Sequence, residues 1–235
     1  MKKRILSLLW RSAAWTLILL LATPTVALAA SIVLDGLFDD WAGQPNISDP
    51  IGDATPARVD ISAVYWANNP GVSNTYFMIQ RAFPGGQGNQ VVYYSVFIDT
   101  NCNGSYSEST DRRIFVAYSP QNNIGVVVVA VLSGTGSLIS TTGGNWGDPR
   151  GSEPNGGTRA EFYASFSDLG ISPNQQICFY VASFQNAGDS TPVDTTASIT
   201  WTPIPAMGYA LLAAFVLLAV GIAWSRKAFA GWKKP

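Results

Sequence analysis

The sequence predicts an all-β domain, an antiparallel β-sandwich, followed by one C-terminal transmembrane helix. Short apolar or alternating runs rich in Val, Ile, Tyr and Phe recur along the chain, as strands of a sandwich do. Gly, Pro, Asn, Asp and Ser separate these runs and favour turns. Only 12% of the 235 residues are charged, well below an ordinary soluble domain, which indicates additional apolar segments outside the globular part.

Residues 1–30 have the three parts of a secretory signal peptide. Basic residues at positions 2–4 precede an apolar run at 15–22, and small residues follow at 27–30. We expect cleavage after Ala29 or Ala30; an uncleaved membrane anchor is the alternative. In either case the residues that follow are exported.

Residues 31–203 form the predicted ectodomain, long enough for one domain with a substantial core. The apolar runs predict strands at 59–67, 75–82, 91–99, 112–118, 124–132, 159–166, 177–184 and 197–201. Residues 126–129 are four consecutive Val, which predicts a central strand covered on both faces. Residues 134–157 are rich in Gly, Ser, Thr and Asn and predict a long hairpin excursion or a surface loop.

Residues 204–225 predict the transmembrane helix, and residues 226–235 a cytoplasmic basic tail. The stretch 206–224 contains no charged residue, and 19 residues in a helix nearly span the hydrocarbon core of about 30 Å. Lys and Arg after the span hold the tail on the cytoplasmic side. This topology predicts a single-pass cell-surface protein, with a prokaryotic envelope as the expected location.

The charge distribution and the absence of His exclude several classes of function. Residues 12–225 hold six Arg, no Lys and all 15 acidic residues, a net charge of −9, which repels nucleic-acid phosphates. A chain without His has no Ser-His-Asp triad and no His-ligated zinc site. No motif marks a pair of acids as glycosidase catalysts. We therefore expect neither nucleic-acid binding nor catalysis.

Three segments in order resemble family 9 carbohydrate-binding modules: Ile32–Trp41, Val96–Asn101 and Arg159–Ile171. In that family the first segment turns at Asp-Gly, with a Trp that seals the sandwich edge. The second is similar to a central strand that ends in an Asp-rich loop, and the third to a late strand that runs into a short helical turn. The resemblance implies a jelly-roll-like sandwich, structural calcium and sugar binding through aromatic side chains.

The C-terminus resembles a different kind of signal. Thr202-Pro203-Ile204-Pro205, the apolar helix and Ser225-Arg226-Lys227 are similar to the tripartite sorting signals of exosortase-type enzymes. This resemblance implies a sorting protease as a partner. The chain has neither a Pro-Glu-Pro nor a Leu-Pro-x-Thr-Gly motif here. A plain stop-transfer anchor is the alternative.

The segment from Asp99 to Asp111 is the first candidate metal site. Asp99, Asn101 and Asn103 place side-chain oxygens at relative positions 1, 3 and 5, and Gly104 follows at position 6, as in the first half of a calcium loop. Position 12 is Thr, so Glu108 or Asp111 would complete the ligand set. A turn rich in Asn and Asp, without metal, is the alternative.

Asp49, Asp53 and Asp60 form the second candidate site. They lie in and beside a short loop that contains Gly52, and a dication would relieve the repulsion among three clustered carboxylates. A solvated acidic loop is the alternative. Calcium is the expected ion for both sites.

Cys102 and Cys178 are the two cysteines of the chain. Export to an oxidising compartment predicts one disulfide between them, and two unpaired thiols are the alternative. Trp146, within the Gly-rich segment, is the candidate for stacking against a sugar ring; a Trp that anchors its own loop is the alternative.

These features predict a noncatalytic cell-surface binding protein, stabilised by calcium and anchored by its C-terminal helix. The resemblance makes envelope or matrix polysaccharide the expected ligand. The alternative is a structural or adhesive surface protein that associates with other proteins and binds no sugar.

Overall fold

The structure, a computed structural model, describes residues 31–69, 71–82, 91–119, 126–146 and 157–203. The predicted signal peptide, transmembrane helix, basic tail and sorting motif from Ile204 onward lie outside the described residues. Within these ranges no helix is long and apolar enough to cross a bilayer.

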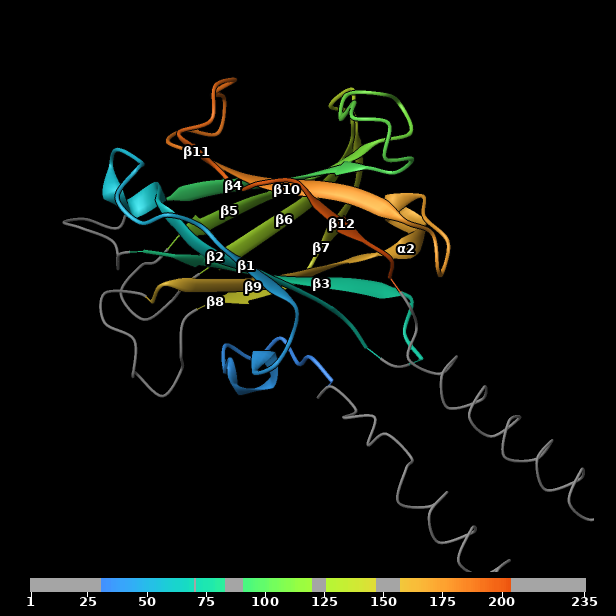
Figure 1. Cartoon of the computed structure of the whole chain (residues 1–235), viewed down its shortest axis with the longest axis horizontal. Coiled ribbons are helices and arrows are strands. Elements are labelled where there is room, and N and C mark those ends of the chain that lie inside the picture. The colour runs from blue at the N-terminus through green and yellow to red at the C-terminus, as the bar shows by residue number, and fades with distance from the viewer. Residues whose placement is uncertain (1–30, 70, 83–90, 120–125, 147–156, 204–235) are drawn as a thin grey trace, which may run out of the picture.

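Two antiparallel sheets pack as a sandwich, which confirms the predicted all-β class (Figure 1). Sheet A has the order β1-β2-β3-β9-β8 and sheet B the order β11-β10-β4-β5-β6-β7, with β12 also paired to β10. Sheet A comprises β1 (Asn46–Ser48), β2 (Ile61–Asn68), β3 (Asn74–Arg81), β9 (Arg159–Ser165) and β8 (Gly144–Trp146). Sheet B comprises β11 (Asp194–Thr195), β10 (Ile177–Phe184), β4 (Val92–Asp99), β5 (Arg112–Ser119), β6 (Val126–Ser133) and β7 (Leu138–Thr142), and β12 is Ile199–Trp201.

Three short helical turns complete the described elements: η1 (Asp39–Trp41), η2 (Ala57–Val59) and α2 (Phe166–Leu169). The turn α2 is the one expected after the strand at 159–166. The Ser165 side chain caps it by accepting a hydrogen bond from the Asp168 N–H, and Gly170 ends it in the left-handed conformation (φ 64°). Within the described ranges these three turns are the helical elements.

The main core lies between the sheets and contains a cluster of aromatic rings. Phe179 of β10 meets Trp66 of β2, Phe77 of β3 and Trp201 of β12 edge-on, at ring-centroid distances of 5.4, 5.5 and 6.3 Å. Edge-to-face contacts of this kind add about 1 kcal/mol each to the burial of the rings. They join strands that are distant in sequence.

A second apolar cluster covers the outer face of sheet A. Ile32, Phe38 and Trp41 of the N-terminal segment pack there against Tyr76 and Met78 of β3. Figure 1 shows this segment below sheet A. Trp41 thus packs on the sheet's outer face.

The carboxylate of Glu161 in β9 lies beneath this segment and is fully buried. It accepts hydrogen bonds from the Gly36 N–H (2.7 Å) and the Trp41 Nε1–H (2.9 Å). Burial raises the pKa of Glu161 to about 7, against the effect of these two bonds. A buried acid thus fastens the N-terminal segment to the sheet.

Each predicted strand has a counterpart in the structure, with ends shifted by a few residues. The prediction that residues 126–129 are covered on both faces is wrong. Val129 is buried in the core, but Val128 points outward with 52% of its surface exposed. The segment 134–157 begins with the turn and second strand of the β6–β7 hairpin and then crosses to sheet A as β8. The predicted hairpin is therefore present within residues 134–146.

Candidate metal centre

Three carboxylates from distant parts of the chain converge at one end of the sandwich. One carboxylate oxygen from each of Asp49, Asp53 and Asp194 lies within 4.8 Å of the other two. Calcium binds oxygens at about 2.3–2.6 Å, so oxygens up to about 5 Å apart can ligate the same ion. The separation therefore suits one shared cation.

The two sheets position these acids from opposite sides. Asp49 follows β1 of sheet A, and its N–H donates to the Ser62 carbonyl of β2 (2.9 Å). Asp194 belongs to β11 of sheet B and accepts hydrogen bonds from the Ile61 N–H of sheet A and from its neighbour's N–H at Thr195, both at 2.7 Å. The cluster thus lies where the sheets are joined.

Asp60 is a fourth acid beside the cluster, and it is fully buried. One of its oxygens accepts a hydrogen bond from the Gly52 N–H (2.7 Å), within the loop that carries Asp49 and Asp53. Its other oxygen, Oδ1, has no hydrogen-bond partner among the described residues, and the same is true of Asp49 Oδ2. An oxygen buried without a partner is costly for a carboxylate and is readily satisfied by an ion.

Burial and the neighbouring negative charges raise the pKa of Asp49 and of Asp194. The pKa of Asp49 rises to about 6 because of burial first, and then because of the negative charges of Asp194, Asp53 and Asp60 and a hydrogen bond with Asp194. Burial also raises the pKa of Asp194, with further contributions from Asp53 and Asp60. Carboxylates that resist ionisation together become favourable ligands when a dication supplies the opposite charge.

Further buried polar atoms without partners lie near Asp194. Ser183 of β10 stands opposite both Asp194 and Tyr94 of β4 in the sheet register. Ser183 Oγ, Tyr94 Oη and the Nε and Nη1 of Arg81 are buried with no hydrogen-bond partner in the described chain. The charges of Arg81 and Asp194 both act on Tyr94. This end of the sandwich is therefore polar inside, unlike the aromatic core.

The sequence predicted Asp49, Asp53 and Asp60 as one candidate site, and the structure brings these three residues together. It adds Asp194, which sequence reasoning missed. Asp194 is a single acid in a Thr- and Ser-rich stretch, 141 positions after Asp53, so no local spacing marks it. Only the pairing of β11 with β10 places it beside the loop.

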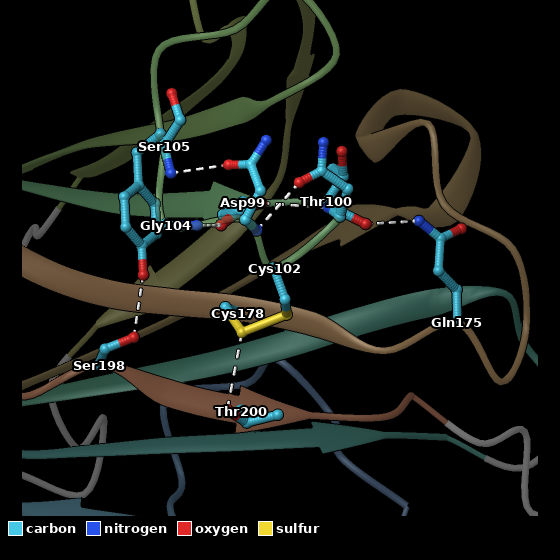
Figure 2. Close-up of a disulfide and its surroundings, with 12 residues drawn as sticks. Asp99, Thr100, Cys102, Gly104, Ser105, Gln175, Cys178, Ser198 and Thr200 are labelled. Atoms are coloured by element: carbon cyan, nitrogen blue, oxygen red, sulfur yellow. Dashed lines mark hydrogen bonds between the residues drawn. A yellow bond between two sulfur atoms is a disulfide. The ribbon is translucent and has the colours of Figure 1, made fainter.

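The Asp99 loop, the other predicted site, is held by its own hydrogen bonds (Figure 2). Asp99 accepts from the N–H groups of Asn101 (3.1 Å) and Gly104 (2.7 Å). Gly104 has φ 89°, a conformation that favours glycine, and nothing lies within 4 Å of an added Cβ. The loop is a well-formed turn.

The acids that were expected to complete that loop are partnered in the same way. Asp111 accepts from the N–H groups of Thr100 (3.3 Å) and Glu108 (2.8 Å). Glu108 accepts from the side-chain amides of Asn101 (3.3 Å) and Asn103 (2.9 Å). Each carboxylate oxygen of the Asp99 loop therefore has a donor, in contrast to the orphaned oxygens of Asp49 and Asp60. Calcium in this loop stays a prediction.

The predicted disulfide is present: Cys102 is bonded to Cys178, with their Cα atoms 5.1 Å apart (Figure 2). It ties the Asp99 loop to β10. Gln175, just before β10, adds a hydrogen bond from its side-chain amide to the Thr100 carbonyl (2.8 Å). The disulfide is typical of an extracytoplasmic domain.

Trp146 ends β8, where its backbone pairs with Ala160 of β9. Its side chain lies outside what the structure describes, so its role as a stacking residue stays a prediction.

No known protein-family model matches this chain, and no curated protein is significantly similar to it. The resemblances to family 9 carbohydrate-binding modules and to sorting signals thus rest on the quoted segments alone.

Proposed function

We propose that this protein is a noncatalytic, exported binding module whose β-sandwich is stabilised by calcium at Asp49, Asp53 and Asp194. The observation that carries the proposal is the convergence of these three carboxylates beside the buried, unpartnered Oδ1 of Asp60. The ligand set is all oxygen, which suits a hard cation. The expected place is the cell surface, with the C-terminal helix as membrane anchor.

Electrostatics explain why a cation stabilises the folded state. Two like charges 4.8 Å apart repel by roughly 3 kcal/mol at an effective dielectric constant of about 20. No Arg in the described ranges forms an ion pair with these acids. A bound dication replaces the repulsion with attraction and joins β11 of sheet B to the loop after β1 of sheet A.

Glycans of the envelope or matrix are the proposed ligand class, as the resemblance of the three segments implies. A structural or adhesive role is the second candidate, and the β6–β7 edge of sheet B favours it. Val128, Leu138 and Ile139 expose 52%, 64% and 42% of their surface there. Leu138 and Ile139 belong to the edge strand β7, and exposed apolar side chains on an edge strand are typical of association with another protein. Concentration-dependent self-association without sugar, measured by light scattering, would favour this second role.

Thermal unfolding of the purified protein, with calcium and then with chelator, tests the cation. At free calcium about 100 times the Kd, a site present only in the folded state adds about 2.7 kcal/mol, or a rise in Tm of roughly 5–10 °C. We expect Asp53→Asn to abolish this rise without loss of folding, because the Asp53 side chain is exposed. Asp49→Asn should do the same, and its Tm in chelator should equal or exceed that of the wild type.

Two substitutions of the same kind serve as controls. Asp168→Asn, on α2, removes a carboxylate far along the chain from the cluster, and Glu108→Gln removes one from the Asp99 loop. Both should keep the full calcium response. A response that survives Asp49→Asn and Asp53→Asn but disappears in Glu108→Gln would move the site to the Asp99 loop and refute the assignment.

A further inference from the structure

The outer face of sheet B carries aromatic side chains around a single guanidinium. Residues that point outward from β4, β5 and β10 alternate with core residues along each strand, and the register aligns them in rows across the sheet. The members of this aromatic face are Tyr93, Phe97, Arg113, Phe115, Tyr180 and Phe184. Phe184 is buried, with 3% of its surface exposed, and the other five are partly exposed. The solvent-facing side of an antiparallel sheet normally carries polar residues. Aromatic residues on this side of sheet B therefore need an explanation.

Arg113 of β5 is held at the centre of this face. Its Nε–H donates to Ser95 Oγ (2.8 Å), and its Cζ lies 5.1 Å from the ring centroid of Phe97, 5.6 Å from that of Phe115 and 5.4 Å from that of Phe184. Its two terminal nitrogens make no hydrogen bond or ion pair with the described residues, and the side chain is partly exposed. Ser95 and the three rings thus fix the position of the guanidinium, whose terminal nitrogens can still donate to a carboxylate.

The rings beside Arg113 stand upright on the sheet. Phe97 and Tyr180 are cross-strand neighbours, with ring centroids 4.9 Å apart and planes 11° from parallel. This separation equals the spacing between strands, so the two rings stack side by side and turn their edges outward. Ring edges carry partial positive charge. The edges and the guanidinium therefore favour an anion.

Charge complementarity identifies the kind of anion. Burial lowers the pKa of Arg113, so its charge is poorly hydrated where it stands. Residues 12–225 carry a net charge of −9, so attraction of an anion to this face depends on the local charge of Arg113 and not on the net charge of the domain. A planar carboxylate accepts two parallel hydrogen bonds from a guanidinium and would supply the missing partner.

Two tyrosine hydroxyls also belong to the aromatic face. Tyr180 and Tyr93 lie in the rows on either side of the Ser95 row, and neither hydroxyl has a hydrogen-bond partner in the described chain. Tyr106 adds a third ring, 4.8 Å from Tyr180 and edge-on to it. In Figure 1 the loops that follow β4 and β10 extend from opposite ends of these strands. A ligand with hydroxyls next to its carboxylate fits this arrangement.

We propose that the aromatic face binds a uronic acid unit of an acidic glycan, with the sugar carboxylate paired to Arg113 and its hydroxyls bonded to Tyr93 and Tyr180. This inference rests on the proposed function, since it names the ligand class and the site of the binding module. It places recognition on sheet B and not at Trp146.

Calorimetric titration of the purified full chain in detergent, with trigalacturonate as probe, tests the inference. We expect binding of trigalacturonate and at least tenfold weaker binding of the neutral galactose trimer. Arg113→Gln should weaken trigalacturonate binding by about tenfold or more, since it removes a bidentate charged contact. Arg113→Lys keeps the charge but loses the fork, so its affinity should fall between those of the wild type and Arg113→Gln.

Arg159→Gln is the matched control, because the Arg159 guanidinium lies over the Phe38 ring on sheet A (4.2 Å) in a similar setting. It should bind trigalacturonate as the wild type does. Thermal unfolding of each variant shows whether it is folded. Each titration is repeated with calcium and with chelator, since calcium alone can bridge carboxylates.

Four results would overturn the inference. Equal binding of the acidic and neutral trimers, or wild-type affinity in Arg113→Gln, would place sugar recognition elsewhere and leave the calcium-stabilised module intact. Equal binding of triglutamate would make the face a site for acidic peptides. Absence of binding by any probe would refute the site. Conversely, if binding depends on Arg113 but calcium does not change the Tm, the proposed calcium site is refuted and the proposed glycan site is not.

Discussion

Replacing both Cys102 and Cys178 by Ser is expected to lower the free energy of unfolding by about 4 kcal/mol. The disulfide closes a loop of 76 residues, and the loss of this crosslink gives the unfolded chain more conformational freedom. Denaturant unfolding of the wild-type protein and of the double variant, both under oxidising conditions and each with its own fitted m-value, measures the difference.

A chemically reduced wild-type sample is the control for the serine hydroxyls. It should unfold at the same denaturant concentration as the double variant. A loss below about 1 kcal/mol in the double variant would show that the crosslink does not constrain the unfolded chain as expected.

Acidification from pH 7 to pH 4.5 is expected to stabilise the fold through Glu161 by on the order of 3 kcal/mol. The pKa of this carboxyl is about 7 in the folded state, because of burial, against an ordinary value of 4.5. The folded state therefore binds the proton more tightly between these pH values. Its contribution to stability is fully present below pH 4.5 and is lost as the pH rises through 7.

Glu161→Gln isolates this effect, because Gln has nearly the same shape and does not titrate. Unfolding is measured in chelator, since Asp49 also titrates near pH 6. We expect the stability of the wild type to decline more steeply with pH than that of Glu161→Gln, while Glu108→Gln follows the wild type. Parallel pH profiles for wild type and Glu161→Gln would refute the assignment.

The strands of the main core were predictable because the residues that they bury are the β-branched and aromatic residues that favour strands. Strands such as β3, β4 and β10 are eight residues long and rich in Val, Ile and aromatic residues, so pattern alone locates them. The strands that the sequence prediction missed, β1, β7, β8 and β11, have two to five residues each. Their pairing depends on the neighbouring strand and not on their own composition.

The candidate metal centre was predictable only in its local part. Asp49 and Asp53 lie in one loop, and Asp60 directly precedes β2, so the proximity of the three acids follows from their closeness in sequence. Asp194 reaches them through the pairing of β11 with β10, at a distance in sequence where spacing carries no information. In the Asp99 loop, by contrast, the sequence spacing resembles half a calcium loop. The Asp99 carboxylate oxygens nevertheless already accept hydrogen bonds from N–H groups of the same loop.

The aromatic face was not visible in the sequence as a site. Its residues come from three strands, and alternation identifies only that they share a side of each strand. The register between β4, β5 and β10 is needed to bring Arg113 beside Phe97 and Phe184.

Anomalous diffraction from crystals grown with calcium tests the cation site most directly. A calcium peak should lie about 2.3–2.6 Å from carboxylate oxygens of Asp49, Asp53 and Asp194. It should be missing from crystals of Asp53→Asn grown under the same conditions. A calcium peak confined to the Asp99 loop, or no peak at saturating calcium, would contradict the proposed centre.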